Sequence, residues 1–336
     1  MKKLLLAVVF FCSFNIYAQS PDSVIEKRIS RLEKIISYLP RISGMLDFRY
    51  QYSSETSTFD IRRARLDFQG EISKYFDYRL QLELTANPCI LDAYARVKIR
   101  PYFNIQGGAF KIPFSLENPY SPKNLEFIDN AMSIIHLSSY QDLSGIRSNG
   151  RDIGIMIYGG FFRKKGFSMV EYSLGIFNGA GINVRDNNKS KDIVGRLNIS
   201  PVKSVTLSAS GYLGQMVVDD DHQYERRDRY GFGFRFDNKK FIFRTEFLTG
   251  LTAGLRSSGG YAVAGYTFID KITPAIRFDI FQNDIHRMDT RRINYAVGLS
   301  YWINKYFRCQ VNYTYRTFFE KENNGSLIMA MVTATF

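Results

Sequence analysis

Phe59 to Leu84 read FDIRRARLDFQGEISKYFDYRLQLEL, and this stretch decides the fold class. Two runs of alternating polar and apolar residues flank a short polar turn. In the first run, polar and apolar residues occupy opposite parities: Arg63, Arg65, Asp67 and Gln69 against Ala64, Leu66, Phe68 and Gly70. Successive side chains of a strand point to opposite faces of a sheet. The stretch therefore predicts a β-hairpin with one charged face and one apolar face.

The same alternation returns along most of the chain. A strand in a soluble sandwich also alternates, so the number and spacing of the runs matter. Each run is close to the ~9–11 residues that a tilted strand needs to cross a bilayer. Sixteen runs can be counted: 42–53, 58–71, 77–86, 91–99, 104–111, 151–162, 167–177, 191–200, 203–215, 229–238, 240–252, 258–268, 272–283, 291–302, 305–317 and 325–336.

The connections between runs also alternate, in length. Tight turns such as 73–76, 100–103 and 163–166 follow every second run, whereas the intervening connections are mostly longer and more polar. Outer-membrane barrels have short periplasmic turns and longer extracellular loops. We therefore predict an all-β fold, a transmembrane antiparallel β-barrel of about 16 strands over residues 41–336. Both termini of the chain are expected on the periplasmic side.

The two ends of the chain carry targeting features. Residues 1–18 combine Lys2 and Lys3 with a short apolar run and Ala18, which is typical of a cleaved secretory signal peptide. Residues 19–40 contain apolar residues at heptad-like spacing and end at Pro40, which predicts a short periplasmic helix. A frayed leader and a coiled coil that helps a homotrimer form are both open interpretations. The final run ends in Phe336, which resembles the signal that outer-membrane assembly machinery recognises.

The chain is basic, and its cysteines are few. The formal charge is +13, and removing residues 1–18, with two lysines and no acidic residue, leaves +11. A basic surface can bind nucleic acid, but we expect no nucleic-acid partner for an exported protein. Two interpretations of the positive charge remain, a solvated surface and a lumen that attracts anions. Cys89 and Cys309 fit no disulfide framework or metal-ligand spacing, so we expect them to be unpaired, with a single bridge as the alternative.

The opening hairpin resembles a known family. IRRARLDFQGEISKYFDYRLQLE is similar to the hallmark hairpin of the phosphate-selective porin O and P family, and GGAFKIPFSLENPYSP (107–122) resembles the segment where that family's chain enters a long loop. The resemblance covers about the first half of the chain. It implies an outer-membrane channel for phosphate or another small anion, surrounded by outer-membrane lipid in a Gram-negative bacterium.

The longest connection, 112–150, is the candidate constriction of the channel. A connection this long is usually functional or disordered, and we expect it to fold into the pore, with an exposed surface loop as the alternative. Arginine keeps its charge and matches phosphate or carboxylate geometry. The alternation places the following basic residues on the lumen face as candidate anion-selective groups: Arg63, Arg65, Arg79, Arg96, Lys98, Arg196, Arg244, Arg277, Arg308 and Arg316.

Arg63, Arg65 and Arg96 are the predicted constriction residues. Lumen-facing acidic residues are numerous enough to pair with several arginines, so a wall of structural ion pairs is the alternative for most of these positions.

The sequence favours a channel over an enzyme. The three histidines fall in predicted outward loops, and no nucleophile, metal-ligand or phosphate-loop pattern accompanies them. We therefore predict a passive channel without a cofactor, a metal or a catalytic residue. A non-conducting barrel that acts through its extracellular loops as an adhesin or receptor is the main alternative, and an outer-membrane hydrolase is a weaker one.

Overall fold

A computed structural model describes residues 25, 28, 29, 31, 39–85, 89–164, 166–218, 223–318 and 325–336. The chain divides into two units, Met1–Pro40 and Arg41–Phe336. The predicted signal peptide lies outside the described residues. So does most of the predicted periplasmic helix, of which Ile25, Arg28, Ile29 and Arg31 are helical. The helix and its role in trimer formation therefore stay predictions.

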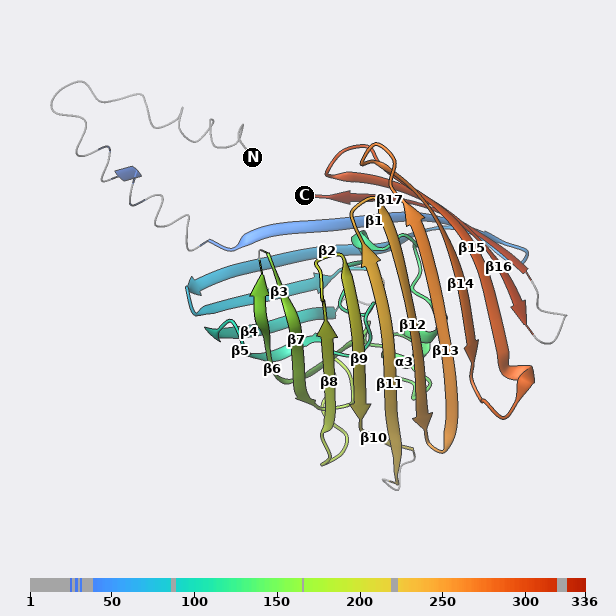
Figure 1. Cartoon of the computed structure of the whole chain (residues 1–336), viewed down its shortest axis with the longest axis horizontal. Helices are drawn as coiled ribbons and strands as arrows, with labels where there is room; N and C mark the ends of the chain where they lie inside the picture. The colour runs from blue at the N-terminus through green and yellow to red at the C-terminus, as the bar shows by residue number, and fades with distance from the viewer. Residues whose placement is uncertain are drawn as a thin grey trace. The chain divides into compact units, whose positions relative to one another are not determined.

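The second unit is a closed antiparallel β-barrel whose strands follow one another in sequence order (Figure 1). Pairing of the first strand with both the second and the last closes the ring. The strands are β1 (Arg41–Ser53), β2 (Ser57–Ser73), β3 (Phe76–Glu83), β4 (Cys89–Arg100), β5 (Phe103–Lys111), β6 (Arg151–Lys164), β7 (Phe167–Phe177), β8 (Asp192–Ile199), β9 (Val205–Leu213), β10 (Gln215–Val217), β11 (Tyr224–Asp237), β12 (Phe241–Thr252), β13 (Leu255–Tyr266), β14 (Ile272–Gln282), β15 (Arg291–Trp302), β16 (Phe307–Phe318) and β17 (Gly325–Thr335).

The short β10 continues β9 after a one-residue break at Gly214, and both pair with β11. Counted as one interrupted strand, they give the sixteen strands that the alternation predicted. The largest boundary difference is in β11, which begins at Tyr224 and not near residue 229. The first residues of β11 are mostly charged, so they lack the alternation that predicted the strands. They lie beyond the apolar belt, where a strand can pair without an apolar outer face.

The outward face of the barrel is apolar. Ile155 and Phe232 are each 63% exposed, although both lie in the middle of a strand. Exposed apolar residues in this pattern form the lipid-facing belt of an outer-membrane barrel. No helix in the described part of the chain is both long and apolar enough to cross a membrane. Cys89 and Cys309 are free thiols, as expected.

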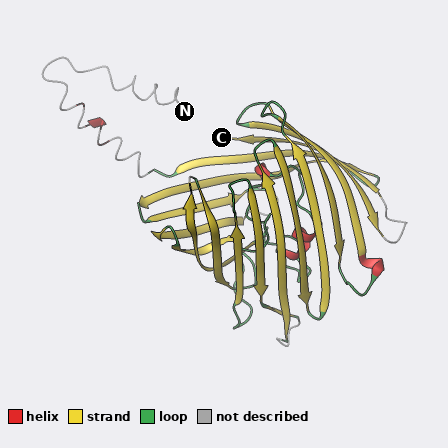
Figure 2. Cartoon of the chain, viewed as in Figure 1, coloured by secondary structure: helices red, strands yellow, loops and turns green. Residues whose placement is uncertain are grey.

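The barrel has a turn end and a loop end. The turn end holds the tight turns, the first residue of β1 and the C-terminus, where the Gly44 amide donates to the Phe336 carbonyl at 3.2 Å. The loop end holds the 112–150 connection, with its two short helices η1 (Pro122–Asn124) and α3 (Met132–Leu137), and η2 (Met288–Thr290) in a separate loop. Figure 2 shows how little of the described barrel is helical.

The 112–150 connection, which we call the inner loop, packs against the inner face of the wall. Phe114, Phe127 and Ile134 are 4% exposed or less and share one apolar cluster with inward residues of β12 and β14, Leu248 and Phe281 among them. Figure 1 shows α3 within the ring of strands. The barrel therefore contains a hydrophobic core on one side of its lumen, where the sequence alternation alone predicted a polar lining.

Glycines on the wall make room for the inner loop. A Cβ built on Gly233 of β11 would lie 2.9 Å from the Leu116 side chain. One on Gly298 of β15 would lie 2.5 Å from Asn312 Nδ2 of the wall and 3.1 Å from the Phe127 ring of the loop. Real Cβ contacts are rarely this short, so glycine at these two positions leaves room for loop side chains and, at Gly298, for Asn312 as well.

Candidate functional site

The base of the inner loop is closed by hydrogen bonds between its two ends. The Ile112 amide donates to the Gly150 carbonyl at 3.0 Å. The buried Asn118 side chain donates from Nδ2 to the carbonyls of Ile112 and Gly150, at 3.1 Å each. Gly150 has a φ of +72°, and a Cβ there would lie 2.0 Å from Asn118 Oδ1, so glycine is required. The loop thus leaves and rejoins the wall at one point.

Two inward residues of β12 hold the first part of the inner loop. The Glu246 carboxylate accepts from Ser115 Oγ at 3.1 Å and from the Leu116 amide at 2.7 Å. Arg244 pairs with Glu117 at 3.1 Å and with Glu126 at 2.7 Å. All six residues are buried. Buried charges are tolerated only when they are paired and hydrogen-bonded. These contacts therefore hold the loop in one defined position against β12.

Side chains of β14 and β16 hold the middle of the inner loop through its backbone. Arg277 donates to the Asp129 carbonyl at 2.7 Å, and Asp279 accepts from the Met132 amide at 3.0 Å. On β16, Asn312 accepts from the Ile128 amide at 2.8 Å. Arg308 donates to the carbonyls of Lys123 and Leu125, at 2.5 and 3.1 Å. Wall side chains thus satisfy backbone groups that the loop could not satisfy by itself.

The last part of the inner loop is held through Asp142. Its carboxylate accepts from Arg229 of β11 at 2.9 Å and lies 4.0 Å from Arg227. Burial raises the pKa of Asp142, but the nearby charges of Arg229 and Arg227 outweigh it and hold that pKa below its ordinary value. Asp142 is therefore ionised at neutral pH and anchors the loop through charge.

One loop contact crosses to the other side of the barrel. Asp129 forms an ion pair with Arg62 of β2. Burial raises the pKa of Asp129, yet the charges of Arg62 and Arg49 hold it below its ordinary value. Arg62 faces the lumen because of a β-bulge, since Asp47 pairs with Arg63 whereas Phe48 pairs with Ile61. Sequence alternation missed Arg62, because parity assigns it to the apolar face.

The rest of the lumen holds a large cavity along β1–β8. Its volume is 820 Å³, and the inner loop forms one of its sides. Nine basic residues line it but only two acidic ones, which gives a formal excess of seven positive charges. The basic residues are Arg41, Arg65, Arg79, Arg96, Lys111, Lys123, Arg151, Arg196 and Lys305, and the acidic residues are Asp67 and Asp92.

A second cavity, of 720 Å³, lies toward the turn end. Among the described residues its charged lining is also basic, with Lys74, Lys98, Arg100, Arg163 and Arg196 against one acidic residue, Glu171. Arg196 and Ser173 line both cavities. The two cavities therefore adjoin at Arg196, on β8.

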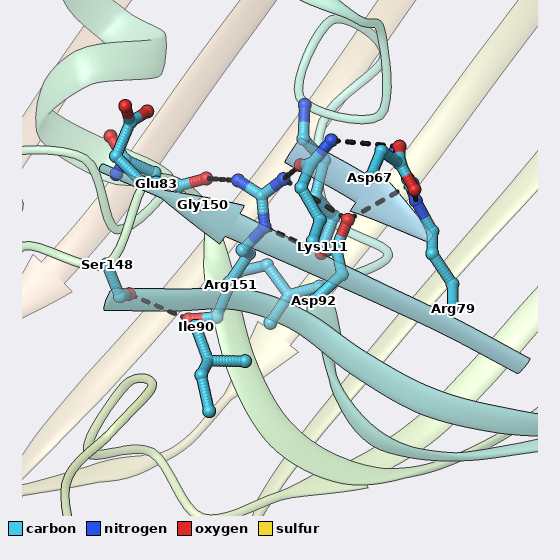
Figure 3. Close-up of polar contacts among 12 residues, drawn as sticks. Asp67, Arg79, Glu83, Ile90, Asp92, Lys111, Ser148, Gly150 and Arg151 are labelled. Carbon is cyan, nitrogen blue, oxygen red and sulfur yellow. Dashed lines mark hydrogen bonds and ion pairs between the residues drawn. The ribbon is translucent and has the colours of Figure 1, made fainter. Parts of the chain in front are cut away.

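Part of the basic wall is neutralised by ion pairs across the strands. Asp92 lies between Arg151 and Arg79, at 2.7 and 3.1 Å, and Arg79 also pairs with Asp67 at 2.5 Å (Figure 3). Arg65 pairs with Glu83 at 2.7 Å. These pairs orient the guanidinium groups. They leave fewer free charges than the number of arginines suggests.

Other cations in the large cavity contact carbonyls and not carboxylates. Lys111 Nζ donates to the carbonyls of Asn118 and Tyr120, at 2.6 and 2.7 Å. Arg196 donates to the Ser115 carbonyl at 3.1 Å. Among the described residues, no carboxylate oxygen lies within 4.0 Å of either charged group. Both residues therefore line the cavity while their charged groups contact backbone oxygens of the inner loop.

The ten basic residues singled out from the sequence fall into three groups. Five line a cavity, namely Arg65, Arg79, Arg96, Lys98 and Arg196. Three bind the inner loop, namely Arg244, Arg277 and Arg308. The other two are Arg63, which pairs with Asp47 at 2.7 Å, and Arg316, which is half-buried on β16.

Sequence reasoning missed Lys111 and Arg151. Both stand next to the inner loop, at the end of one strand and the start of the next, where strand parity is least reliable. Their position in the sequence could have identified them, because they flank the longest connection in the chain.

A closed sixteen-stranded barrel with an apolar exterior, a charged lumen and an inward loop defines a porin. The sequence profile of the family described as phosphate-selective porin O and P matches residues 43–240, more than half of the chain. The chain therefore belongs to the phosphate-selective porin O and P family, as the opening hairpin suggested, and is a porin of the Gram-negative outer membrane.

Solved structures share the fold at low sequence identity. The anion-selective porin from Comamonas acidovorans matches with a TM-score of 0.66 and 10% identity, over 88% of this chain and 99% of that one. Salmonella typhi OmpF, in a complex with daunomycin, matches with a TM-score of 0.65 and 12% identity, over 89% and 98%. The outer membrane channel DcaP of Acinetobacter baumannii matches with a TM-score of 0.62 and 9% identity, over 88% of this chain and 97% of that one. No curated protein matches the sequence.

Proposed function

We propose that the protein is a passive diffusion channel for small anions, phosphate among them, and that the solute passes along β1–β8. The observation that carries this proposal is the basic lining of both cavities, which meet at Arg196. Rings of fixed positive charge select anions, and low-dielectric walls strengthen their field.

In this proposal the inner loop constricts the channel. Most of its wall contacts are with β11, β12, β14 and β16, whereas Asp129 reaches Arg62 of β2 and Ser115 reaches Arg196 of β8. A solute would therefore pass between the loop and the rest of β1–β8. A sixteen-stranded barrel would otherwise leave a wide aqueous lumen. The loop would therefore bring a passing anion close to Lys111 and Arg196.

Further parts of the proposal concern assembly. We infer that residues 1–18 are removed on export, that three copies associate in the membrane, and that assembly machinery recognises the strand ending in Phe336. The signal-peptide pattern, the general architecture of porins and the terminal Phe support these inferences. The chemistry required is binding and diffusion, without a catalytic residue or cofactor.

Planar-bilayer conductance across a potassium chloride gradient tests the channel. We expect a stable conductance and a reversal potential that favours chloride, with millimolar phosphate reducing the chloride current. Arg196→Gln should lower the chloride-to-potassium permeability ratio several-fold, because the variant removes a charge that no carboxylate offsets. Arg256→Gln is a matched control, since Arg256 is exposed and lines neither cavity.

A folded barrel that conducts no ions would overturn the proposal. Folding can be checked independently, because an intact barrel migrates differently from a heated one in a gel. That outcome would favour the alternative in which the barrel acts at the cell surface through its loops.

A further inference from the structure

We infer that, among organic anions of the same charge, the channel prefers those with an apolar part, such as medium-chain carboxylates, over polyhydroxylated ones. This inference rests on the proposed anion channel and names its solute class. It comes from the mixed lining of the large cavity, where cationic and apolar groups lie next to one another.

The inner loop supplies one apolar surface. Pro113, Pro119 and Pro122 all line the large cavity. Lys111 Nζ donates to the carbonyls of Asn118 and Tyr120, the two residues on either side of Pro119. The ammonium group is therefore held against the backbone that carries a proline ring, so a cation and an apolar surface form a single unit.

The barrel wall repeats this pairing. The Arg96 guanidinium lies over the Tyr94 ring, 5.4 Å from its centroid, and pairs with Asp77 at 2.6 Å; Arg96 and Tyr94 both line the large cavity. The Met156 side chain, from β6, lines the same cavity and is half-buried. Two sides of the cavity thus present positive charge beside apolar area.

This arrangement distinguishes solutes by shape and polarity. A carboxylate with a hydrocarbon part can place its charge at Lys111, whose hydrogen-bond partners are carbonyls, and remove its apolar part from water against the prolines and Met156. A polyhydroxylated acid satisfies the cation equally well. Its remaining polar atoms, however, would have to give up water at apolar surfaces that offer no hydrogen bonds.

The test compares hexanoate with gluconate, which are both six-carbon monocarboxylates. Reversal potentials with potassium hexanoate on one side of the bilayer and potassium gluconate on the other give their permeability ratio. We expect hexanoate to exceed gluconate by a larger factor than the ratio of their mobilities in water. Hexanoate should also reduce the chloride current at concentrations where gluconate does not.

Two neighbouring inward positions offer matched variants. Gln106 of β5 and Met156 of β6 are directly paired across the strands, line the same cavity and have side chains of similar length. Met156→Gln should lower the hexanoate-to-gluconate ratio about two- to threefold, and Gln106→Met should raise it, because area burial scales with apolar surface. Neither variant changes the lumen charge, so the chloride-to-potassium ratio should stay constant.

A ratio equal to that of the mobilities, unchanged by both variants, would overturn the inference while leaving the anion channel standing. Loss of chloride preference in the unmodified protein would instead overturn the proposed channel itself. If Met156→Gln fails to fold, Pro119→Ser removes apolar area from the loop side and should lower the ratio in the same way. A Pro119→Ser variant with the unmodified ratio would count against the inference.

Discussion

The two sides of the barrel use arginine in different ways. On β11, β12, β14 and β16, arginines such as Arg244 bind the carboxylates and carbonyls of the inner loop, and their charge is used within a packed interior. On β1–β8, arginines face an 820 Å³ cavity; most of them pair with carboxylates of neighbouring strands, and Arg196 contacts the Ser115 carbonyl. One residue type therefore anchors a loop on one side and lines the solute path on the other.

The difference shows that an inward-facing arginine in a barrel does not indicate a pore-lining residue by itself. What separates the two roles is whether the guanidinium also lines a cavity, and not the kind of partner. Arg244 is buried between two loop carboxylates and lines neither cavity, whereas Arg79 pairs with two carboxylates and still lines the large cavity. Arg196 contacts a loop carbonyl and stands where the two cavities meet. Each prediction below tests one side of this contrast.

The largest effect is expected at Arg244. Arg244→Ala leaves the buried carboxylates of Glu117 and Glu126 without their partner, and removing one member of a buried pair costs about 3–5 kcal/mol. We expect a lower temperature for the gel shift of the barrel and a larger, noisier conductance as the loop loosens. If Arg244→Ala leaves both readouts as in the parent, the loop does not depend on this anchor.

A packing variant on the same side should have an intermediate effect. Gly233→Ala places a methyl group 2.9 Å from Leu116, and overpacking of this kind costs about 1–3 kcal/mol. The gel-shift temperature should fall, and the double variant with Leu116→Ala should recover part of the loss. Gly211→Ala is the control, because no atom lies within 4 Å of the added Cβ. Equal effects of the two glycine variants would contradict the proposed contact.

On the β1–β8 side, two neighbouring arginines allow a charge that lines the cavity to be compared with a charge that does not. Arg65 lines the large cavity, whereas Arg63 pairs with Asp47 and lines neither cavity. We expect Arg65→Gln to lower the chloride-to-potassium ratio modestly, less than Arg196→Gln, and Arg63→Gln to lower it least. Reversal potentials of the three variants in one salt gradient give the order. A larger effect of Arg63→Gln than of the other two variants would support the sequence-based prediction that Arg63 lies at the constriction.

The smallest effect concerns acid stability at the loop end. The charges of Arg229 and Arg227 hold the pKa of Asp142 in the folded protein below its ordinary value of 3.8. The stabilising contribution of Asp142 is therefore complete above that ordinary value and is lost as pH falls through the lower pKa of the folded state. Asp142→Asn should therefore lower the gel-shift temperature at pH 7, by an amount that shrinks at strongly acidic pH. A difference independent of pH would mean that Asp142 acts through shape and not through charge.

The sequence alternation predicted the sixteen strands because strand parity is a local property that lipid and water impose on every residue. It also placed Arg65, Arg79 and Arg96 correctly on the inward face. It could not separate Arg244 from Arg196, because their partners, Glu117, Glu126 and Ser115, lie in a loop far away in sequence.

Local irregularities explain other differences. The bulge that turns Arg62 inward changes the parity of one strand, and a single extra residue leaves no mark in the alternation itself. Inward apolar residues such as Leu248 could be recognised as anomalous for a polar lumen. What covers them is visible only once the inner loop is in place.

The closed base of the inner loop makes it an exchangeable insert. Because Ile112 and Gly150 are joined by a 3.0 Å hydrogen bond, β5 and β6 keep their register whatever length of chain lies between those two residues. Closing a longer connection between fixed ends costs little additional entropy. A barrel of this design can therefore acquire a wider, narrower or differently charged passage by replacement of one continuous segment together with the inward residues that pack against it, such as Arg244 and Leu248, while the strand register stays the same.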